Sequence, residues 1–227
     1  MARFTRLQVL NRILELGLVP VFYHHDLETA IRIVEACAAG GATVVEFTNR
    51  GDLAYEVFAG LVRHFATANP EVILGVGSIV DPGTAALYIA SGANFVVGPV
   101  LNPEVARVCN RRKIPYSPGC GSASEISAAE ELGVEIVKVF PGAEVGGPGF
   151  VKAILGPCPW TLIMPTGGVE ATRESVEAWF KAGVAAVGVG SNLIRKDLVE
   201  KGDFAAITAR VAQMLEWIRE ARQGRRA

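Results

Sequence analysis

Lys138 is the residue of this chain whose position most directly suggests chemistry. It interrupts the apolar run Ile-Val-Lys-Val-Phe-Pro at 136–141, which is typical of a strand buried on both faces. Burying an unpaired ammonium is costly, and burial lowers a lysine pKa until the neutral amine can attack a carbonyl carbon. The segment therefore predicts a nucleophilic lysine. It also allows a lysine near the strand end whose ammonium extends to solvent.

A second ionisable residue, Glu46, interrupts the apolar run at 44–48, and Arg50 follows it four residues later. A carboxylate beside Lys138 could transfer protons for the lysine, or the two could form a buried ion pair without a catalytic role. Arg50 keeps its proton, its planar fork suits a carboxylate, and its charge would lower the pKa of Lys138. A loop arginine at the surface is the other interpretation of Arg50.

Glycines follow the last two predicted strands. Gly167 and Gly168 end the segment Pro-Thr-Gly-Gly at 165–168, and Gly190 and Ser191 end Gly-Val-Gly-Ser at 188–191. Exposed backbone N–H groups in such loops bind phosphate well, although glycines also occur in ordinary tight turns. Two such loops at neighbouring strands favour a phosphate site.

His24 and His25 are adjacent histidines near the end of the first predicted strand. Neighbouring residues of a strand point to opposite faces, so we expect no shared metal ion there, although either ring could line a pocket. The four cysteines show no Cys-x-x-Cys spacing, which argues against a zinc site.

The elements that position these residues form a repeated pattern. A glycine after a helical segment precedes an apolar run at 40–45, 91–97, 132–137 and 182–187, and further apolar runs occupy 19–23, 72–76, 114–117 and 161–165. Eight such strands with alternating helices predict an α/β fold, a TIM (β/α)8 barrel, with an open doubly wound sheet as the structural alternative.

The whole chain, 1–227, is expected to form one barrel domain, in which an additional helix at about 4–17 comes before the first strand. Asp26 should cap one helix, and Pro103 should lie in the first turn of another. Residues 146–149 (Gly-Gly-Pro-Gly) predict a flexible loop at the rim of the site. The tail after 219 is expected to fray.

Bulk composition excludes several classes of function. Half of the 227 residues are apolar, and the formal net charge is −1, which disfavours nucleic acid or a membrane surface as a partner. The sequence lacks a signal-peptide pattern or an apolar run long enough to span a membrane, so we expect a cytoplasmic protein with reduced thiols.

The segments 45–50, 75–78, 137–141, 165–169 and 190–191 resemble, in order and spacing, those of the 2-keto-3-deoxy-6-phosphogluconate (KDPG) / 4-hydroxy-2-oxoglutarate (KHG) aldolases, which are class I pyruvate aldolases. The resemblance runs from about 19 to 193. It implies a homotrimeric TIM barrel without metal or other cofactor. The implied roles are a Schiff base on Lys138, acid–base catalysis by Glu46, pyruvyl-carboxylate binding by Arg50 and Ser78, a pocket lined by Phe140 and Pro99, and phosphate binding at Gly167, Gly168, Gly190 and Ser191.

The function implied by this resemblance is reversible cleavage of KDPG to pyruvate and glyceraldehyde 3-phosphate, in Entner–Doudoroff carbohydrate metabolism. An aldolase for an unphosphorylated 2-keto-3-deoxy sugar acid, or for 4-hydroxy-2-oxoglutarate, is one alternative. A phosphosugar-binding barrel, such as an epimerase or synthase, and a catalytically silent barrel are others. Asn49 departs from the family pattern, which usually has an apolar residue there, and Ser78 stands where threonine is usual.

Overall fold

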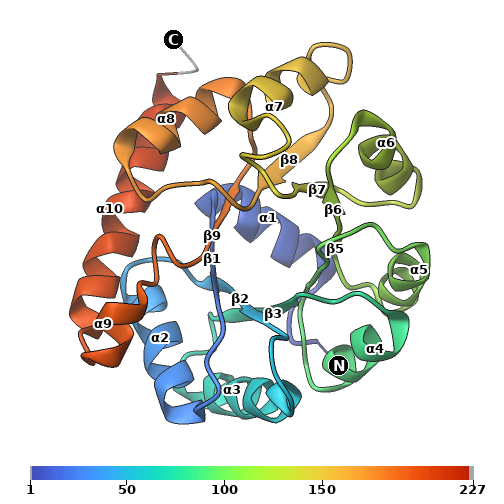
Figure 1. Cartoon of the computed structure of the whole chain (residues 1–227). Coiled ribbons are helices and arrows are strands. Elements are labelled where there is room, and N and C mark those ends of the chain that lie inside the picture. The colour runs from blue at the N-terminus through green and yellow to red at the C-terminus, as the bar shows by residue number, and fades with distance from the viewer. Residues whose placement is uncertain (1, 225–227) are drawn as a thin grey trace.

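The computed structural model describes residues 2–224 as short parallel strands that alternate with helices (Figure 1). The strands are β1 (Leu18–Phe22), β2 (Val44–Thr48), β3 (Ile73–Gly77), β4 (Val96–Val97), β5 (Tyr116–Ser117), β6 (Gly119–Cys120), β7 (Ile136–Val139), β8 (Leu162–Pro165) and β9 (Val187–Val189). The helices are α1 (Arg6–Leu16), α2 (Leu27–Ala39), α3 (Ala54–Ala68), α4 (Pro82–Ala90), α5 (Pro103–Arg112), α6 (Ala123–Glu131), α7 (Gly147–Leu155), α8 (Arg173–Ala182), α9 (Lys196–Glu200) and α10 (Phe204–Gln223).

The strands form a curled, parallel arrangement in two hydrogen-bonded sheets. One has the order β5-β4-β3-β2-β1-β9 and the other β6-β7-β8. A parallel bridge between Thr166 and Gly188 links the end of β8 to β9. The fifth predicted strand is divided into β5 and β6 at Pro118, which has no N–H to donate to a neighbouring strand. The α/β prediction is therefore confirmed.

Alternation along the strands separates two apolar clusters. Outward residues pack against the surrounding helices, whereas inward residues such as Val19, Val44 and Ile73 form a smaller cluster with Val9 and Ile13 of α1. Figure 1 shows α1 crossing the centre of the strand arrangement and the other helices lying outside it. Because α1 covers the amino ends of the strands, the carboxyl ends are left for a site.

Local sequence explains where most helices begin. As predicted, the Asp26 carboxylate accepts the N–H of Thr29 at the start of α2, and Pro103 lies in the first turn of α5. The Asn102 side chain caps that helix. The prediction of a flexible loop at 146–149 was wrong, because α7 begins at Gly147. Pro148 occupies the first turn of that helix, where its fixed φ angle suits helical geometry.

Both chain ends differ slightly from the prediction. The expected N-terminal helix is α1, which has a capping box formed by Thr5 and Gln8. At the other end, α10 continues to Gln223 instead of fraying after 219, because the Arg222 guanidinium donates to the carbonyls of Leu14, Glu15 and Ala185. Residues 225–227 of the expected tail lie outside the described residues.

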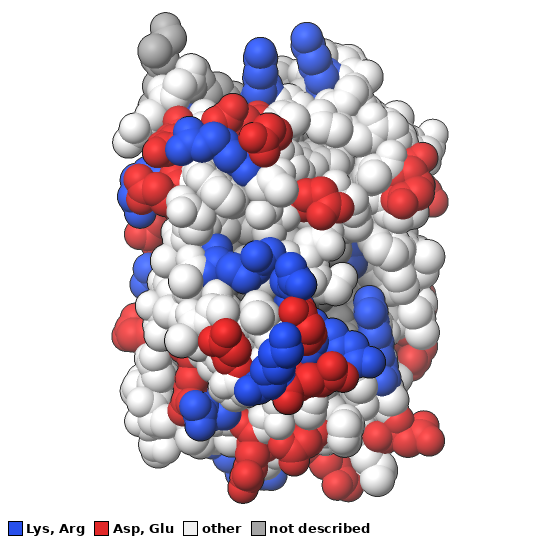
Figure 2. Space-filling model, turned by 60° about the vertical axis from the view of Figure 1, so that its left-hand side comes forward, with Lys and Arg blue, Asp and Glu red and all other residues white. Residues whose placement is uncertain are grey.

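The surface over α9 and α10 carries acidic and basic side chains that are interspersed (Figure 2). Many are matched within one helix, for example Arg219 with Glu216 and Lys196 with Glu200. Within residues 2–224, none of the helices is long and apolar enough to cross a membrane.

Candidate active site

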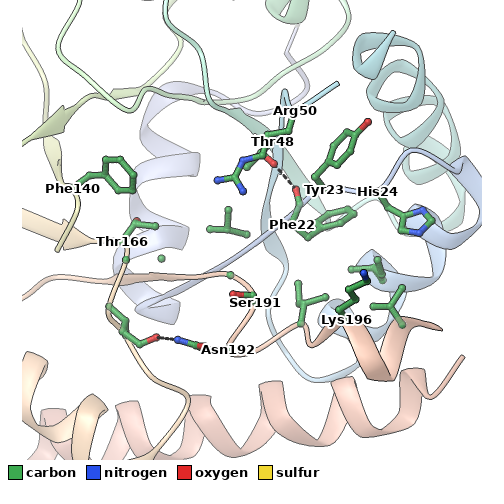
Figure 3. Close-up of a pocket in the computed structure, with 18 of the residues that line it drawn as sticks. Phe22, Tyr23, His24, Thr48, Arg50, Phe140, Thr166, Ser191, Asn192 and Lys196 are labelled. Carbon is green, nitrogen blue, oxygen red and sulfur yellow. Dashed lines mark hydrogen bonds between the residues drawn. The ribbon is translucent and has the colours of Figure 1, made fainter. Parts of the chain in front are cut away.

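A cavity of about 800 Å³ opens at the carboxyl ends of the strands (Figure 3). Its walls come from the ends of β1, β2, β7, β8 and β9 and from the short helix α9. The residues that line it are Val21, Phe22, Tyr23, His24, His25, Ile33, Thr48, Arg50, Phe140, Thr166, Gly167, Gly168, Val169, Gly188, Gly190, Ser191, Asn192, Ile194, Lys196, Val199 and Glu200.

Lys138 lies on β7, two residues before Phe140; Phe140 lines the cavity, whereas Lys138 is not itself among the lining residues. Only 5% of it is exposed, so the side chain is buried and does not extend to solvent. Its Nζ atom lies 4.7 Å from the centre of the Phe140 ring. Burial is the main cause that lowers the Lys138 pKa; Glu46 opposes this shift and Arg50 adds to it. The structure thus favours a neutral amine at the base of the site.

Glu46 lies on β2 in register with Gly75 of β3, and only 1% of it is exposed. Gly77 makes room for its carboxylate, since a Cβ atom there would lie 1.8 Å from Oε1. Burial is the largest influence and raises the Glu46 pKa, against the opposite effects of Lys138 and Arg50. Oε2 has no hydrogen-bond partner in the described part of the chain.

The ion-pair alternative for Glu46 and Lys138 is not what the structure shows. Across residues 2–224, no contact of 4 Å or less joins their charged atoms. The carboxyl group has a raised pKa, the amine has a lowered pKa, and each influences the other electrostatically. Two titratable groups shifted in this way are typical of an acid–base and nucleophile pair.

Arg50 follows β2 and extends its guanidinium into the cavity (Figure 3). Nearby, the Thr48 hydroxyl donates to the Phe22 carbonyl over 3.2 Å and ties the ends of β1 and β2 together. On the opposite wall, the Phe140 ring faces the same space. An arginine and an aromatic ring that line one cavity, with a buried amine 4.7 Å from the centre of that ring, suit a small planar keto acid.

The predicted phosphate loops also reach the cavity, because Gly167, Gly168, Gly190 and Ser191 all line it. Gly167 and Gly168 have φ angles of 87° and 71°, which favour glycine. A Cβ atom at Gly168 would lie 2.1 Å from that of Ala143. Among the described residues, the N–H groups of Gly167, Gly168 and Ser191 donate to no protein acceptor. The loops thus present donors to an anion.

Four predicted site residues are not among those that line the cavity: the buried Lys138 and Glu46 described above, and Ser78 and Pro99. Ser78 follows β3, is half-buried and has a φ angle of 62°. Pro99 follows β4 and is half-buried, and its carbonyl packs closely on Gly119. Both are at the carboxyl ends of strands, as expected, but on the side of β3 and β4 that the cavity does not reach.

Sequence reasoning missed several cavity residues, above all Thr48, Thr166 and Lys196. Thr48 and Thr166 lie on or next to strands, two residues after Glu46 and Met164, so the alternation of strand side chains could have identified them. The Thr166 hydroxyl is buried without a partner in the described residues. Lys196 belongs to the short helix α9, which was not predicted and carries no distinctive sequence signal.

His24 and His25 both line the cavity. They follow β1 instead of lying within it, so their rings stack 4.8 Å apart and do not point to opposite faces. Within the described part of the chain, no cluster of three or more histidine, cysteine, aspartate or glutamate side chains could hold a metal ion.

Known proteins resemble this chain over most of its length. The family model "KDPG and KHG aldolase" matches residues 9–210. The 2-dehydro-3-deoxy-phosphogluconate aldolase of Haemophilus influenzae is 29% identical over 95% of this chain and 99% of its own length. The KHG/KDPG aldolase of Escherichia coli K12 is 31% identical over 87% and 90%.

A crystal structure of KDPG aldolase from Legionella pneumophila has the same fold, with a TM-score of 0.82 and 30% identity over 89% of this chain and 96% of that one. In that structure pyruvate is captured as a covalent carbinolamine intermediate. A family match of this extent, together with the curated relatives, assigns the chain to the KDPG and KHG aldolase family, whose members are class I carbon–carbon lyases.

Proposed function

We propose that this chain cleaves KDPG reversibly to pyruvate and glyceraldehyde 3-phosphate through a Schiff base on Lys138. The observation that carries the proposal is the buried Lys138 amine, whose pKa is lowered beside a cavity that also presents Arg50 and Phe140. A neutral amine is the form that attacks a ketone. The covalent pyruvate carbinolamine of the Legionella relative supports the same chemistry here.

Binding of the pyruvyl half is assigned to the end of the cavity near Lys138. The Arg50 guanidinium pairs with the substrate carboxylate, and the Ser78 hydroxyl donates a further hydrogen bond to it. Ser78 directly follows Gly77, which makes room for the Glu46 carboxylate. Phe140 lines the cavity and encloses the reacting carbons; Pro99, like Ser78, lies outside that lining, and its contact with these carbons is proposed from the family resemblance. Holding the carboxylate in this way directs C2 of the substrate toward the amine.

The chemical steps use one amine and one carboxyl group. The Lys138 amine attacks C2 and forms a carbinolamine. Because its pKa is raised, the Glu46 carboxyl can carry a proton, and it donates this proton to the C2 hydroxyl, which leaves as water and yields the iminium. The resulting Glu46 carboxylate takes the C4 hydroxyl proton, the C3–C4 electron pair moves into the iminium, and the aldehyde departs. Protonation of the enamine at C3 and hydrolysis release pyruvate and regenerate the amine.

The phosphate of the substrate is assigned to the two loops that follow β8 and β9. The N–H groups of Gly167, Gly168 and Ser191, without protein acceptors among the described residues, and the backbone at Gly190 supply donors there. The reaction as written needs no metal or other cofactor, because the iminium itself accepts the electron pair. A substrate that is anionic at both ends can use Arg50 for one anion and these N–H groups for the other.

The proposal includes the architecture. The two sheets are proposed to act as one closed (β/α)8 barrel domain spanning the chain, supported by the bridge from Thr166 to Gly188 and the division of one strand at Pro118. The barrel is proposed to assemble as a homotrimer, by analogy with the family. The four cysteines are all free, which fits a cytoplasmic enzyme of carbohydrate metabolism.

Borohydride reduction in the presence of pyruvate tests the mechanism. We expect a reduced pyruvyl adduct, located by peptide mass spectrometry on Lys138 and lost in Lys138→Met. Lys196→Met is the matched control, since Lys196 also lines the cavity but is exposed; this variant should still form the adduct. An adduct that persists in folded Lys138→Met protein, or that lies on Lys196, would overturn the assignment.

A further inference from the structure

Among the described residues, no side chain holds the Arg50 guanidinium in place, so its position depends on the backbone from which it extends. Among the described residues, no acceptor lies within hydrogen-bond distance of its nitrogen atoms, and no carboxylate lies within 4 Å. The side chain is exposed within the cavity. Its reach toward a substrate carboxylate therefore depends on how firmly the segment 49–51 is fixed.

One fixed point of this segment is Asn49. Its N–H donates to the Gly77 carbonyl over 2.9 Å, and its side-chain oxygen accepts a hydrogen bond of 2.8 Å from the Tyr88 hydroxyl. Tyr88 comes from α4, is only 1% exposed, and packs its ring edge-on against Phe58 at 5.2 Å. A rigid, buried phenol thus holds the residue immediately before Arg50.

The Tyr88 hydroxyl is suited to this task. Burial, with a smaller contribution from Tyr23, raises the Tyr88 pKa to about 12, so the hydroxyl stays protonated and acts as a donor at neutral pH. Asn49 remains half-buried, and its amide oxygen is a strong neutral acceptor. The contact joins α4 to the end of β2 across residues 39 positions apart.

The other side of the segment is fixed by Tyr23. A Cβ atom at Gly51 would lie 2.3 Å from the Tyr23 hydroxyl oxygen, so the ring packs directly on the backbone after Arg50. Tyr23 is held in turn by the Phe47 ring, with ring centres 5.7 Å apart. Arg50 is therefore flanked by two contacts from different elements.

We propose that Tyr88 and Asn49 are positioning residues for the Arg50 guanidinium, so that their hydrogen bond sets the affinity for the carboxylate of the pyruvyl substrate. This inference rests on the proposed function, in which Arg50 holds that carboxylate. Neither residue lines the cavity or touches the reacting carbons. They act by limiting the directions in which Arg50 can point.

Tyr88→Phe tests the proposal, because it removes the hydroxyl and keeps the ring. The KM for pyruvate, measured in aldol synthesis at saturating aldehyde, should rise about 3- to 10-fold, the range that one lost hydrogen bond supplies. The KM for the aldehyde should stay unchanged. Thr208→Val is the matched control, since it deletes a half-buried hydroxyl bonded to Ala36 over 3.1 Å on the distant α10; both KM values should keep their wild-type size.

A double-mutant cycle with Arg50→Ala separates the possible outcomes. If Tyr88 acts through Arg50, Tyr88→Phe should not change the pyruvate KM once Arg50 is absent. An equal rise in both backgrounds, or no rise in the wild-type background, would overturn the positioning role. If Arg50→Ala alone leaves the pyruvate KM unchanged, the carboxylate-binding role in the proposed function fails, and the positioning role with it. Asn49→Ala replaces Tyr88→Phe if the latter does not fold.

Discussion

Replacing Gly77 by alanine should displace the Glu46 carboxylate and slow catalysis. The added Cβ atom would lie 1.8 Å from Oε1 and 2.7 Å from Cδ, whereas ordinary contact begins near 3.4 Å. The carboxylate must therefore retreat by about 1.6 Å, the difference between 3.4 and 1.8 Å. A misplacement of about 1 Å costs on the order of 10²-fold in rate, or about 2.7 kcal/mol of activation free energy, so kcat should fall at least that far.

The assay is steady-state pyruvate release from KDPG, with unfolding temperature measured in parallel. Forcing an extra methyl into a packed site costs about 1–3 kcal/mol, which lowers the Tm of a chain of this size by about 2–12 °C. Gly149→Ala is the matched control, because a Cβ atom there would meet nothing within 4 Å. It should leave kcat unchanged.

A second substitution tests the steric cause directly. Glu46→Asp withdraws the carboxylate by one methylene, about 1.5 Å, which nearly matches the required retreat. Adding Gly77→Ala to Glu46→Asp should then cost much less in Tm than adding it to the wild-type chain. Wild-type kcat in folded Gly77→Ala protein would refute the reasoning, because it would show that catalysis does not depend on the position of this carboxylate.

Three further predictions concern the same site. Glu46→Gln should lower kcat about 10²- to 10⁴-fold, as expected for lost acid–base catalysis, and a wild-type rate would reduce Glu46 to a structural role. Lys138→Met should raise Tm at neutral pH. The Lys138 pKa in the folded protein lies below its ordinary value of 10.5, so the unfolded chain binds more protons between these two pKa values and the stability of the wild-type protein rises with pH. Thermal melts should therefore show that the higher Tm of Lys138→Met disappears above pH 10.5. Gly168→Ala, which would collide with Ala143, should raise the KM for KDPG more than that for pyruvate, and equal changes would argue against a phosphate site.

The burial of the two central ionisable residues was predictable because charged residues in apolar runs are conspicuous. Lys138 and Glu46 stand out in the sequence for the same physical reason that their pKa values shift in the structure, namely the cost of burying a charge. Their distance and the absence of a direct ion pair among the described residues were not predictable. Both depend on how far β2 and β7 stand apart around the curled sheet.

The cavity walls were harder to predict from sequence. Thr166 is one polar residue in a short turn, and only the structure shows its hydroxyl buried against Gly188 without a partner in the described residues. The short helix α9 leaves no periodic signal in five residues, so Lys196 could not be assigned to the site. The glycines at 146–149 led to the wrong prediction of a loop, because glycine is typical of loops, whereas Pro148 lies here in the first turn of α7.

The contacts of Arg222 have a consequence for how the chain is made. Its guanidinium satisfies the terminal carbonyls of α1 at Leu14 and Glu15 across 208 and 207 positions of sequence. Synthesis proceeds from the amino end, so the nascent chain forms its first helix without this partner until Arg222 itself has left the ribosome. We expect truncation before Arg222 to impair maturation far more than replacement of Arg222 by lysine, which keeps a donor, since truncation leaves the carbonyls of Leu14 and Glu15 without their Arg222 partner.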